Sequence, residues 1–249
     1  SLDSLFVMRG GYSENNDNTG NVSVSRRNRL LNTLPMYLGH LEELELQHNR
    51  FNGTIPSALS WLPSVVSINL SSNDLTGSIP SLSSRSLVFV DVSFNSLNGS
   101  LPHSLFEGNV KELFAEHNQL SGSLPRAELL SELQQLQLSS NRLNGTIEYV
   151  LNVHRRLRYL NVSNNSFTGT LDGIEKLMKL QVFDVSHNDF YGFLPVSIGQ
   201  LLLLNRFVVS HNRLSGHLPS FKFQLFEQLS RRAMEAPSHE HLEDLVVLF

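Results

Sequence analysis

Hydrophobic and polar positions alternate in short stretches that recur along the chain. Two apolar residues separated by one polar residue, as in Leu44-Glu45-Leu46, predict a short strand with one buried face. In the same copy an asparagine, Asn49, is followed after four residues by Gly53 and after seven by Pro56. The asparagine recurs at positions 28, 49, 73, 95, 118, 141, 165, 188 and 212, and its eight intervals average 23 residues. This period predicts a repeat protein.

Each position of the repeat has a physical role that its residue type indicates. Asparagine both donates and accepts hydrogen bonds, so it can satisfy buried backbone groups where the chain leaves the strand. Glycine permits a left-handed backbone, and proline fixes an extended segment. Between copies, Leu59 and Leu62 have the spacing of a helical turn. Stacked copies therefore predict an asparagine ladder of Asn49, Asn73, Asn95, Asn118, Asn141, Asn165, Asn188 and Asn212.

A single copy cannot bury both of its faces, so neighbouring copies must stack. We expect a solenoid over residues 22–219 with about nine repeats, and a polar, partly disordered segment over residues 1–21. Residues 220–249 are predicted to form a helical cap, with a second helix after Ser238 that presents Leu242, Leu245, Val246 and Phe249 on one face. The alternative is that this tail docks on another subunit.

Composition excludes several classes of function. The chain has 249 residues, no cysteine, 17% charged residues and a net charge of −4. The lack of cysteine excludes a disulfide scaffold, a thiolate metal site and a cysteine nucleophile. A pI near 6.2 argues against nucleic acid as a partner. Apolar runs stay far below the ~18 residues of a membrane span, so we expect no membrane segment in this chain. The chain begins at Ser1, which predicts a processed or partial sequence.

Motifs for catalysis and for cofactor binding are missing from the sequence. No GxSxG, HExxH or GxxxxGK pattern is present, and His239-Glu240-His241 has no evident third metal ligand. Histidine precedes the ladder asparagine in four copies, at His48, His117, His187 and His211, and we interpret these as solvated edge residues rather than a metal site or a pH sensor. We therefore predict a protein that is not an enzyme and uses no cofactor or metal.

The pattern LxxLxLxxNxLxGxIP, with tails such as Gly53-Thr54-Ile55-Pro56 and Gly77-Ser78-Ile79-Pro80, resembles the plant-type leucine-rich repeat (LRR). This form occurs in the ectodomains of LRR receptor-like kinases and receptor-like proteins. The resemblance implies a right-handed superhelix or horseshoe of α/β class, with a parallel β-sheet on its concave face and short helical or 3-10 turns on its convex face. It also implies an extracellular or cell-surface protein that binds a protein or peptide.

The chain departs from the resembled family in one respect, because members usually carry paired cysteines in caps at both ends. It also contains no kinase signature. Two alternatives therefore stay open: an intracellular LRR scaffold subunit of a larger assembly, and an inhibitor of secreted hydrolases.

Solenoids generally bind partners on the concave face of their sheet. Counting back from each ladder asparagine, the solvent-facing positions carry clustered carboxylates with interleaved aromatic rings, a suitable site for an extended peptide with Lys or Arg. The alternative is that these are tolerated surface aromatics or an oligomer contact. The candidate ligand-binding residues are Glu43, Glu45, Phe89, Asp91, Phe94, Glu112, Phe114, Glu116, Tyr159 and Asp184.

Several N-x-S/T sequons fit a secreted glycoprotein. The glycosylation candidates are Asn21, Asn52, Asn98, Asn144 and Asn164. Two further sequons, at Asn69 and Asn161, fall in predicted strands and point to the concave face, where a glycan would block docking.

Overall fold

The computed structural model describes residues 40–126, 132–217 and 246–248. These residues belong to two compact units, which meet in the sequence between Leu133 and Gln134. The degenerate copy around Asn28 and the predicted segment 1–21 lie outside the described residues.

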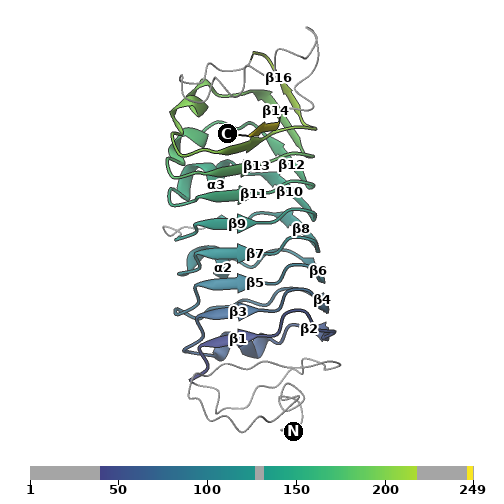
Figure 1. The fold of residues 1–249 in the computed structure, drawn as a ribbon. Helices are drawn as coiled ribbons and strands as arrows, with labels where there is room; N and C mark the ends of the chain where they lie inside the picture. The colour runs from purple at the N-terminus through teal and green to yellow at the C-terminus, as the bar shows by residue number, and fades with distance from the viewer. Residues whose placement is uncertain (1–39, 127–131, 218–245, 249) are drawn as a thin grey trace. The chain divides into compact units, whose positions relative to one another are not determined.

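Unit 1 is a stack of coils, and each coil contributes one strand to each of two parallel sheets (Figure 1). The first sheet has the order β1-β3-β5-β7 and the second β2-β4-β6-β8. The elements are β1 (Glu43–Glu45), β2 (Asn52–Thr54), η1 (Ser57–Trp61), β3 (Ser67–Asn69), β4 (Asp74–Gly77), β5 (Phe89–Asp91), β6 (Ser96–Gly99), α2 (Ser104–Glu107), β7 (Glu112–Phe114) and β8 (Gln119–Ser123).

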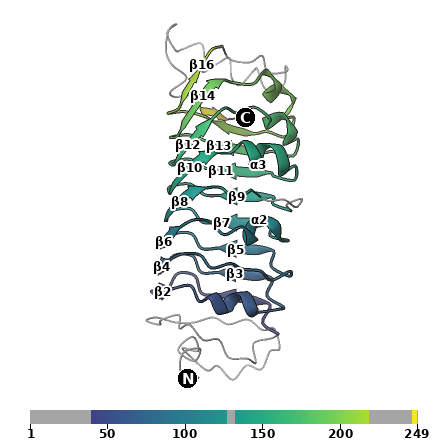
Figure 2. The ribbon, with the colours of Figure 1, turned by 180° about the vertical axis from the view of Figure 1, so that it is seen from behind.

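Unit 2 repeats this architecture, with a first sheet β9-β11-β13-β15-β17 and a second sheet β10-β12-β14-β16. Short helical segments lie behind the first sheet, as the rear view shows (Figure 2). The elements are β9 (Gln135–Gln137), β10 (Arg142–Thr146), α3 (Glu148–Val153), β11 (Tyr159–Asn161), β12 (Ser166–Gly169), η2 (Ile174–Lys176), β13 (Val182–Asp184), β14 (Asp189–Phe193), η3 (Val196–Gln200), β15 (Arg206–Val208), β16 (Arg213–Ser215) and β17 (Val246–Leu248).

The predicted α/β stack of parallel strands and short helical turns is confirmed in both units. The second sheet was not predicted, because its strands are short and all of them except β16 contain a glycine. Those glycines are left-handed, for example Gly53 at φ +88° and Gly77 at φ +75°. At Gly77 a Cβ would also lie 2.8 Å from Thr54 Cγ2 of the preceding coil, so this glycine makes room for its neighbour as well.

The ladder asparagines connect each coil to the one before it. Asn95 Nδ2 donates to the carbonyls of Val92 and Ser93 at 3.2 and 3.0 Å and to Leu70 of the preceding coil at 3.0 Å. Its Oδ1 accepts from the amide of Leu75 at 3.0 Å. One side chain thus satisfies four backbone groups across two coils. The same pattern recurs at Asn73, Asn118, Asn165, Asn188 and Asn212.

The residue before each ladder asparagine also adopts a left-handed backbone, although none of these residues is glycine. The φ values lie between +52° and +56° at His48, Ser72, Phe94, His117, Ser140, Asn164, His187 and His211. Such a backbone costs roughly 1 kcal/mol in a residue with a Cβ, so stacking must over-determine it. This left-handed residue turns the chain from the first sheet toward the second and points its side chain outward. We call these eight residues, one in each coil, the edge column.

The predicted C-terminal helix through Leu245, Val246 and Phe249 is wrong for residues 246–248. They form β17, which pairs antiparallel with β15 through Phe207↔Val247. Val246-Val247-Leu248 contains two β-branched residues in a row, a composition that favours a strand. An edge strand with unpaired backbone groups at β15 provides the partner. The other predicted helical positions of the tail lie outside the described residues.

Candidate ligand-binding face

Eight of the ten predicted ligand-binding residues lie in unit 1, where parallel pairing arranges them in columns. One column runs Glu43, Ser67, Phe89 and Glu112 across β1, β3, β5 and β7, and the next runs Glu45, Asn69, Asp91 and Phe114. Side chains of alternating residues point to one side of a sheet, and the intervening Leu44, Ile68, Val90 and Leu113 are buried. We call this surface of unit 1 the acidic-aromatic face: Glu43, Glu45, Phe89, Asp91, Phe94, Glu112, Phe114 and Glu116.

Two phenylalanines form the centre of this face. In the register of β5 and β7, Phe89 lies opposite Glu112 and Asp91 lies opposite Phe114. The two rings therefore meet on the diagonal, with centroids 5.6 Å apart and planes tilted by 41°. Both rings are half-buried, so each leaves part of its surface to solvent. An apolar pair flanked by carboxylates on the same strands is suited to the aliphatic stem and charged head of Lys or Arg.

Glu116 follows β7 and lies in the column next to this aromatic pair. Burial raises the pKa of its carboxyl above 4.5, and the negative charge of Asp91 raises the pKa further, against a backbone hydrogen bond that lowers it. Among the described residues, no hydrogen-bond partner reaches its buried Oε2. A carboxylate that is partly desolvated and incompletely bonded gains most from an incoming cation.

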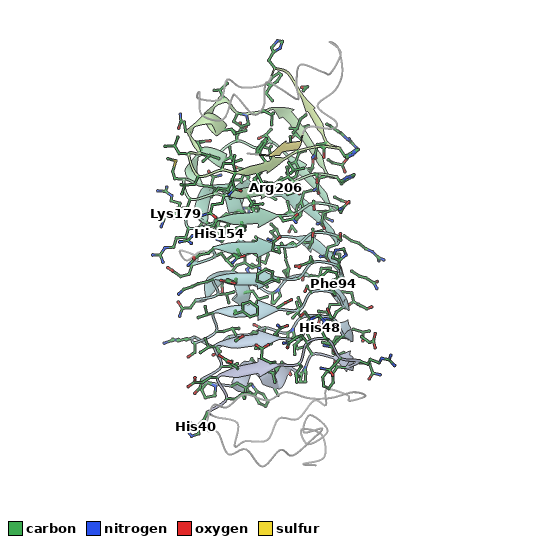
Figure 3. All side chains as sticks on the ribbon, in the orientation of Figure 1. His40, His48, Phe94, His154, Lys179 and Arg206 are labelled. Atoms are coloured by element: carbon green, nitrogen blue, oxygen red, sulfur yellow. The ribbon has the colours of Figure 1, made fainter. Side chains whose placement is uncertain are left out.

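Phe94 and His117 extend the face into the edge column. Their rings stack with centroids 4.4 Å apart and planes 19° from parallel, and Phe94 is 50% exposed. Figure 3 shows Phe94 and His48 on the same side of unit 1, where the chain passes toward the second sheet. The left-handed backbone at Phe94 and at His117 turns both side chains outward, and the two rings then pack against each other at the surface.

The remaining two predicted residues, Tyr159 and Asp184, belong to unit 2. Tyr159 is half-buried on β11, opposite Gln135 and Val182. Asp184 differs from the solvent-facing carboxylate that we expected, because it is only 8% exposed. Its Oδ1 accepts from the backbone and hydroxyl of Ser186, and Arg206 Nη2 lies 3.5 Å from its Oδ2. We therefore leave Asp184 out of the proposed ligand contacts.

An Asx-x-Ser hydrogen bond, missed at the sequence level, explains several polar residues in the strands. Asp91 Oδ1 accepts from the amide of Ser93 at 2.9 Å and from its hydroxyl at 2.6 Å. Asn69, Asn161 and Asp184 bond the serine two residues on in the same way. The recurrence of Asn or Asp two residues before serine was visible in the sequence and points to a local turn-like bond. These residues brace the end of the strand.

The sequons separate into two environments. Asn69 and Asn161 use their side-chain oxygens to bond Ser71 and Ser163, which are both buried. In contrast, the template sequons are exposed on strands of the second sheets, at Asn52, Asn98 and Asn144, and Asn164 is exposed in the edge column. Asn21 lies outside the described residues. In unit 1 the exposed sequons Asn52 and Asn98 thus lie on the second sheet, whereas most of the acidic-aromatic face lies on the first.

The described residues provide no metal centre. His187 and His211 stack with ring centroids 4.0 Å apart, but no group of three or more potential ligands is found within the parts of the chain that the structure covers. Within the same residues, no helix is both long and apolar enough to cross a bilayer.

Comparison with known proteins agrees with this geometry. The Leucine Rich Repeat family profile matches residues 40–62, 64–85, 156–177 and 179–201. Receptor-like protein 35 of Arabidopsis thaliana is 35% identical over 162 residues, which are 64% of this chain and 15% of that protein. The chain thus spans only a small part of the length of the curated relatives that it matches.

Solved structures of plant receptors are also similar. The LRR ectodomain of the receptor kinase GASSHO1/SCHENGEN3 from Arabidopsis thaliana, in complex with CASPARIAN STRIP INTEGRITY FACTOR 2, has a TM-score of 0.69 and 32% identity over 79% of this chain and 25% of that one. The Arabidopsis receptor kinase HAESA, in complex with the peptide hormone IDA and the co-receptor SERK1, has a TM-score of 0.68 and 30% identity over 73% of this chain and 31% of that one. Four segments of this chain thus match the leucine-rich repeat, and the chain is similar in sequence to a plant receptor-like protein and in sequence and fold to the LRR ectodomains of plant receptor kinases.

Proposed function

We propose that this chain is a non-enzymatic recognition module that binds a protein or peptide on the acidic-aromatic face of unit 1. The observation that carries the proposal is the Phe89–Phe114 pair at 5.6 Å, set among Asp91, Glu112 and Glu116. The fold does not need these outward side chains for its core, since the intervening residues of β5 and β7 supply the buried contacts. The similar receptor kinase HAESA was solved in complex with the peptide hormone IDA, which supports a ligand of this class.

The preferred ligand is an extended segment with Lys or Arg next to an apolar side chain. A cation over Phe89 or Phe114 gains from the ring face and from the flanking carboxylates at the same time. Each such contact is worth about 0.5–2 kcal/mol, so one anchored cation gives a preference of roughly tenfold over a neutral residue. A peptide with Asp or Glu in its place would be repelled.

Binding to matched synthetic peptides tests this proposal. Two peptides of about twelve residues, identical except that Lys replaces Glu at every charged position, are titrated against the chain by calorimetry. We expect the Lys peptide to bind, and Phe114→Ala or Glu116→Gln to weaken its binding about tenfold. Tyr191→Ala on the second sheet of unit 2 is the control, because Tyr191 is an exposed aromatic residue outside the acidic-aromatic face. Equal binding of the two peptides would overturn the ligand class.

We propose further that the module acts outside the cell, as the similar plant receptor ectodomains do. Exposed sequons at Asn52, Asn98, Asn144 and Asn164 would then carry glycans, and in unit 1 those at Asn52 and Asn98 would lie on the second sheet. Secretion from a plant cell followed by glycopeptide mass spectrometry tests this. Unmodified sequons in the secreted protein would remove the argument from glycosylation, and retention inside the cell with a native leader would favour the scaffold alternative.

A further inference from the structure

A row of exposed turns in unit 2 is not explained by the proposed ligand site. Before β11, β13 and β15 the chain makes the same turn, closed by backbone bonds from Leu157 to His154 (2.9 Å), Leu180 to Leu177 (2.8 Å) and Leu204 to Leu201 (3.1 Å). The two central residues of each turn are exposed. We call these six residues the turn row: Arg155, Arg156, Met178, Lys179, Leu202 and Leu203.

The three turns are neighbours because the strands that follow them are paired in register, Tyr159↔Val182 and Val182↔Arg206. Adjacent parallel strands lie about 4.8 Å apart, so the turn tips form a short continuous ridge. Figure 3 shows Lys179 projecting outward on the side of unit 2 opposite its second sheet. The ridge is therefore separate from the exposed sequon face of that unit.

The composition of the turn row is amphipathic. Leu202 is 74% exposed, Leu203 54% and Met178 53%, although turns of this kind usually carry polar residues. Arg155 and Lys179 lie beside them, and no carboxylate occupies a central position in these three turns. In unit 1 the equivalent turns hold Pro63-Ser64 and Arg85-Ser86, so the repeat itself does not require apolar residues there. Exposed leucines next to cations indicate a partner that is apolar and acidic.

The two units differ in charge in the corresponding sense. The described residues of unit 1 carry nine Asp or Glu against four Lys or Arg, and those of unit 2 carry five against eight. The acidic-aromatic face offers the chemistry that the turn row lacks: exposed or half-buried phenylalanines with carboxylates between them. Every copy of the chain therefore presents both members of a complementary pair.

We propose that the turn row of one copy binds the acidic-aromatic face of a second copy. In this contact the cations of Arg155 and Lys179 meet the carboxylates of the face, and Leu202 and Leu203 pack against its phenylalanines. The contact joins two different surfaces, so it is heterologous, and association proceeds head to tail unless the geometry closes it into a ring. This inference rests on the proposed function, because it assigns a second copy as an occupant of the same face.

Sedimentation velocity of the intact chain tests self-association directly. The concentration is varied from about 1 to about 100 µM at about 0.05 M and about 0.3 M salt, because charge pairs at a surface are screened by salt. We expect the mean mass to rise above the 28.0 kDa of one chain with concentration, and high salt to reverse the rise. A single mass of one chain under all conditions overturns the proposal.

Charge reversal at the turn row separates this contact from other self-association. Arg155→Glu with Lys179→Glu, and separately Leu202→Ser with Leu203→Ser, should each weaken self-association at least tenfold. Arg142→Glu, on β10 of the same unit, is the matched control and should leave it unchanged. All these positions are exposed, and circular dichroism checks that each variant folds. Self-association that is the same in the turn-row variants and in the control also overturns the proposal.

Complementation provides the strictest test. A face variant with Glu43→Lys and Glu45→Lys and the turn-row variant with Leu202→Ser and Leu203→Ser should each stay monomeric alone. When they are mixed, the intact face of one meets the intact turn row of the other, and we expect a one-to-one pair. No pair in the mixture refutes the contact. The Lys peptide distinguishes the two proposals: if it binds the wild-type chain while the chain stays monomeric, the proposed function stands and this inference fails.

Discussion

His154 makes the stability of unit 2 depend on pH. Its side chain is fully buried at 0% exposure, at the end of α3, with the ring edge-on to Tyr149 at a centroid distance of 6.3 Å. Burial lowers its pKa from 6.5 to about 4, because an imidazolium ion would lose its hydration there. At neutral pH both the folded and the unfolded chain hold this imidazole neutral. As the pH falls below 6.5, the unfolded chain takes up a proton that the folded chain refuses until about pH 4, so unfolding becomes easier.

The expected size follows from the two pKa values. Between about pH 7 and about pH 4.5 the unequal protonation removes about 2.5 kcal/mol from the free energy of unfolding. Urea unfolding at both pH values measures this loss in the wild-type chain and in His154→Leu. The variant removes the titrating group, whereas the carboxylates titrate in both proteins and cancel in the comparison. Circular dichroism is the better probe, because the only tryptophan, Trp61, lies in unit 1.

The wild-type chain should therefore lose about 2.5 kcal/mol more than His154→Leu over this pH interval. Amide hydrogen exchange in β11 should show the same difference, because Leu157 and the turn after His154 connect directly to that strand. If the two proteins lose stability in parallel, within about 0.5 kcal/mol, His154 is not held neutral by burial and the reasoning is refuted.

Three further predictions concern the ladder, a glycine and the ligand face. Asn188→Ala removes four hydrogen bonds to backbone groups and should lower the free energy of unfolding by about 3 kcal/mol in urea; a loss below about 1 kcal/mol would contradict its role. Gly77→Ala should lower the melting temperature more than Gly53→Ala, because both glycines are left-handed but only a Cβ at position 77 would meet Thr54. Thr54→Ser in the Gly77→Ala background should recover part of the difference. Equal melting temperatures for the two alanine variants would show that the space around the glycine is irrelevant. Glu116→Gln should raise the urea midpoint at neutral pH but leave it unchanged below about pH 4.5. The reason is that the folded state disfavours the ionised carboxyl, so the wild-type side chain costs stability only at pH values where it is ionised. A gain that is independent of pH would contradict this.

The fold was largely accessible from sequence because each coil repeats the same physical solution. The spacing of Asn95 from Leu70 and Leu75 depends only on period and strand position, so one correct copy predicts the others. The tail is different, since Val246 has no repeated neighbour against which a helix and a strand can be compared. Its pairing with β15 is a tertiary contact, which overrides local periodicity.

The sequence predicted which residues lie on the candidate face, but it predicted less well which of their side chains are accessible to a ligand. Alternation placed Phe89 and Phe114 on one side of the sheet, and register then brought their rings together. Alternation could not reveal that Asp184 is paired with Arg206, because that contact depends on the side-chain rotamers of neighbouring coils. The turn row was not predictable for another reason: Leu202 and Leu203 stand in a run of four leucines, Leu201–Leu204, and the sequence alone does not show which of the four leave the core.

The left-handed residue in the edge column has a consequence for protein engineering. Its backbone conformation is set by stacking, and its side chain points away from the core, as the variety of His48, Ser72, Phe94 and Asn164 shows. An exchange at this position is therefore governed mainly by backbone preference, for which Asn and Gly are the most tolerant residues, and hardly at all by packing volume. Each coil thus offers one surface position at a fixed spacing, where the side chain can be substituted without a change to the core.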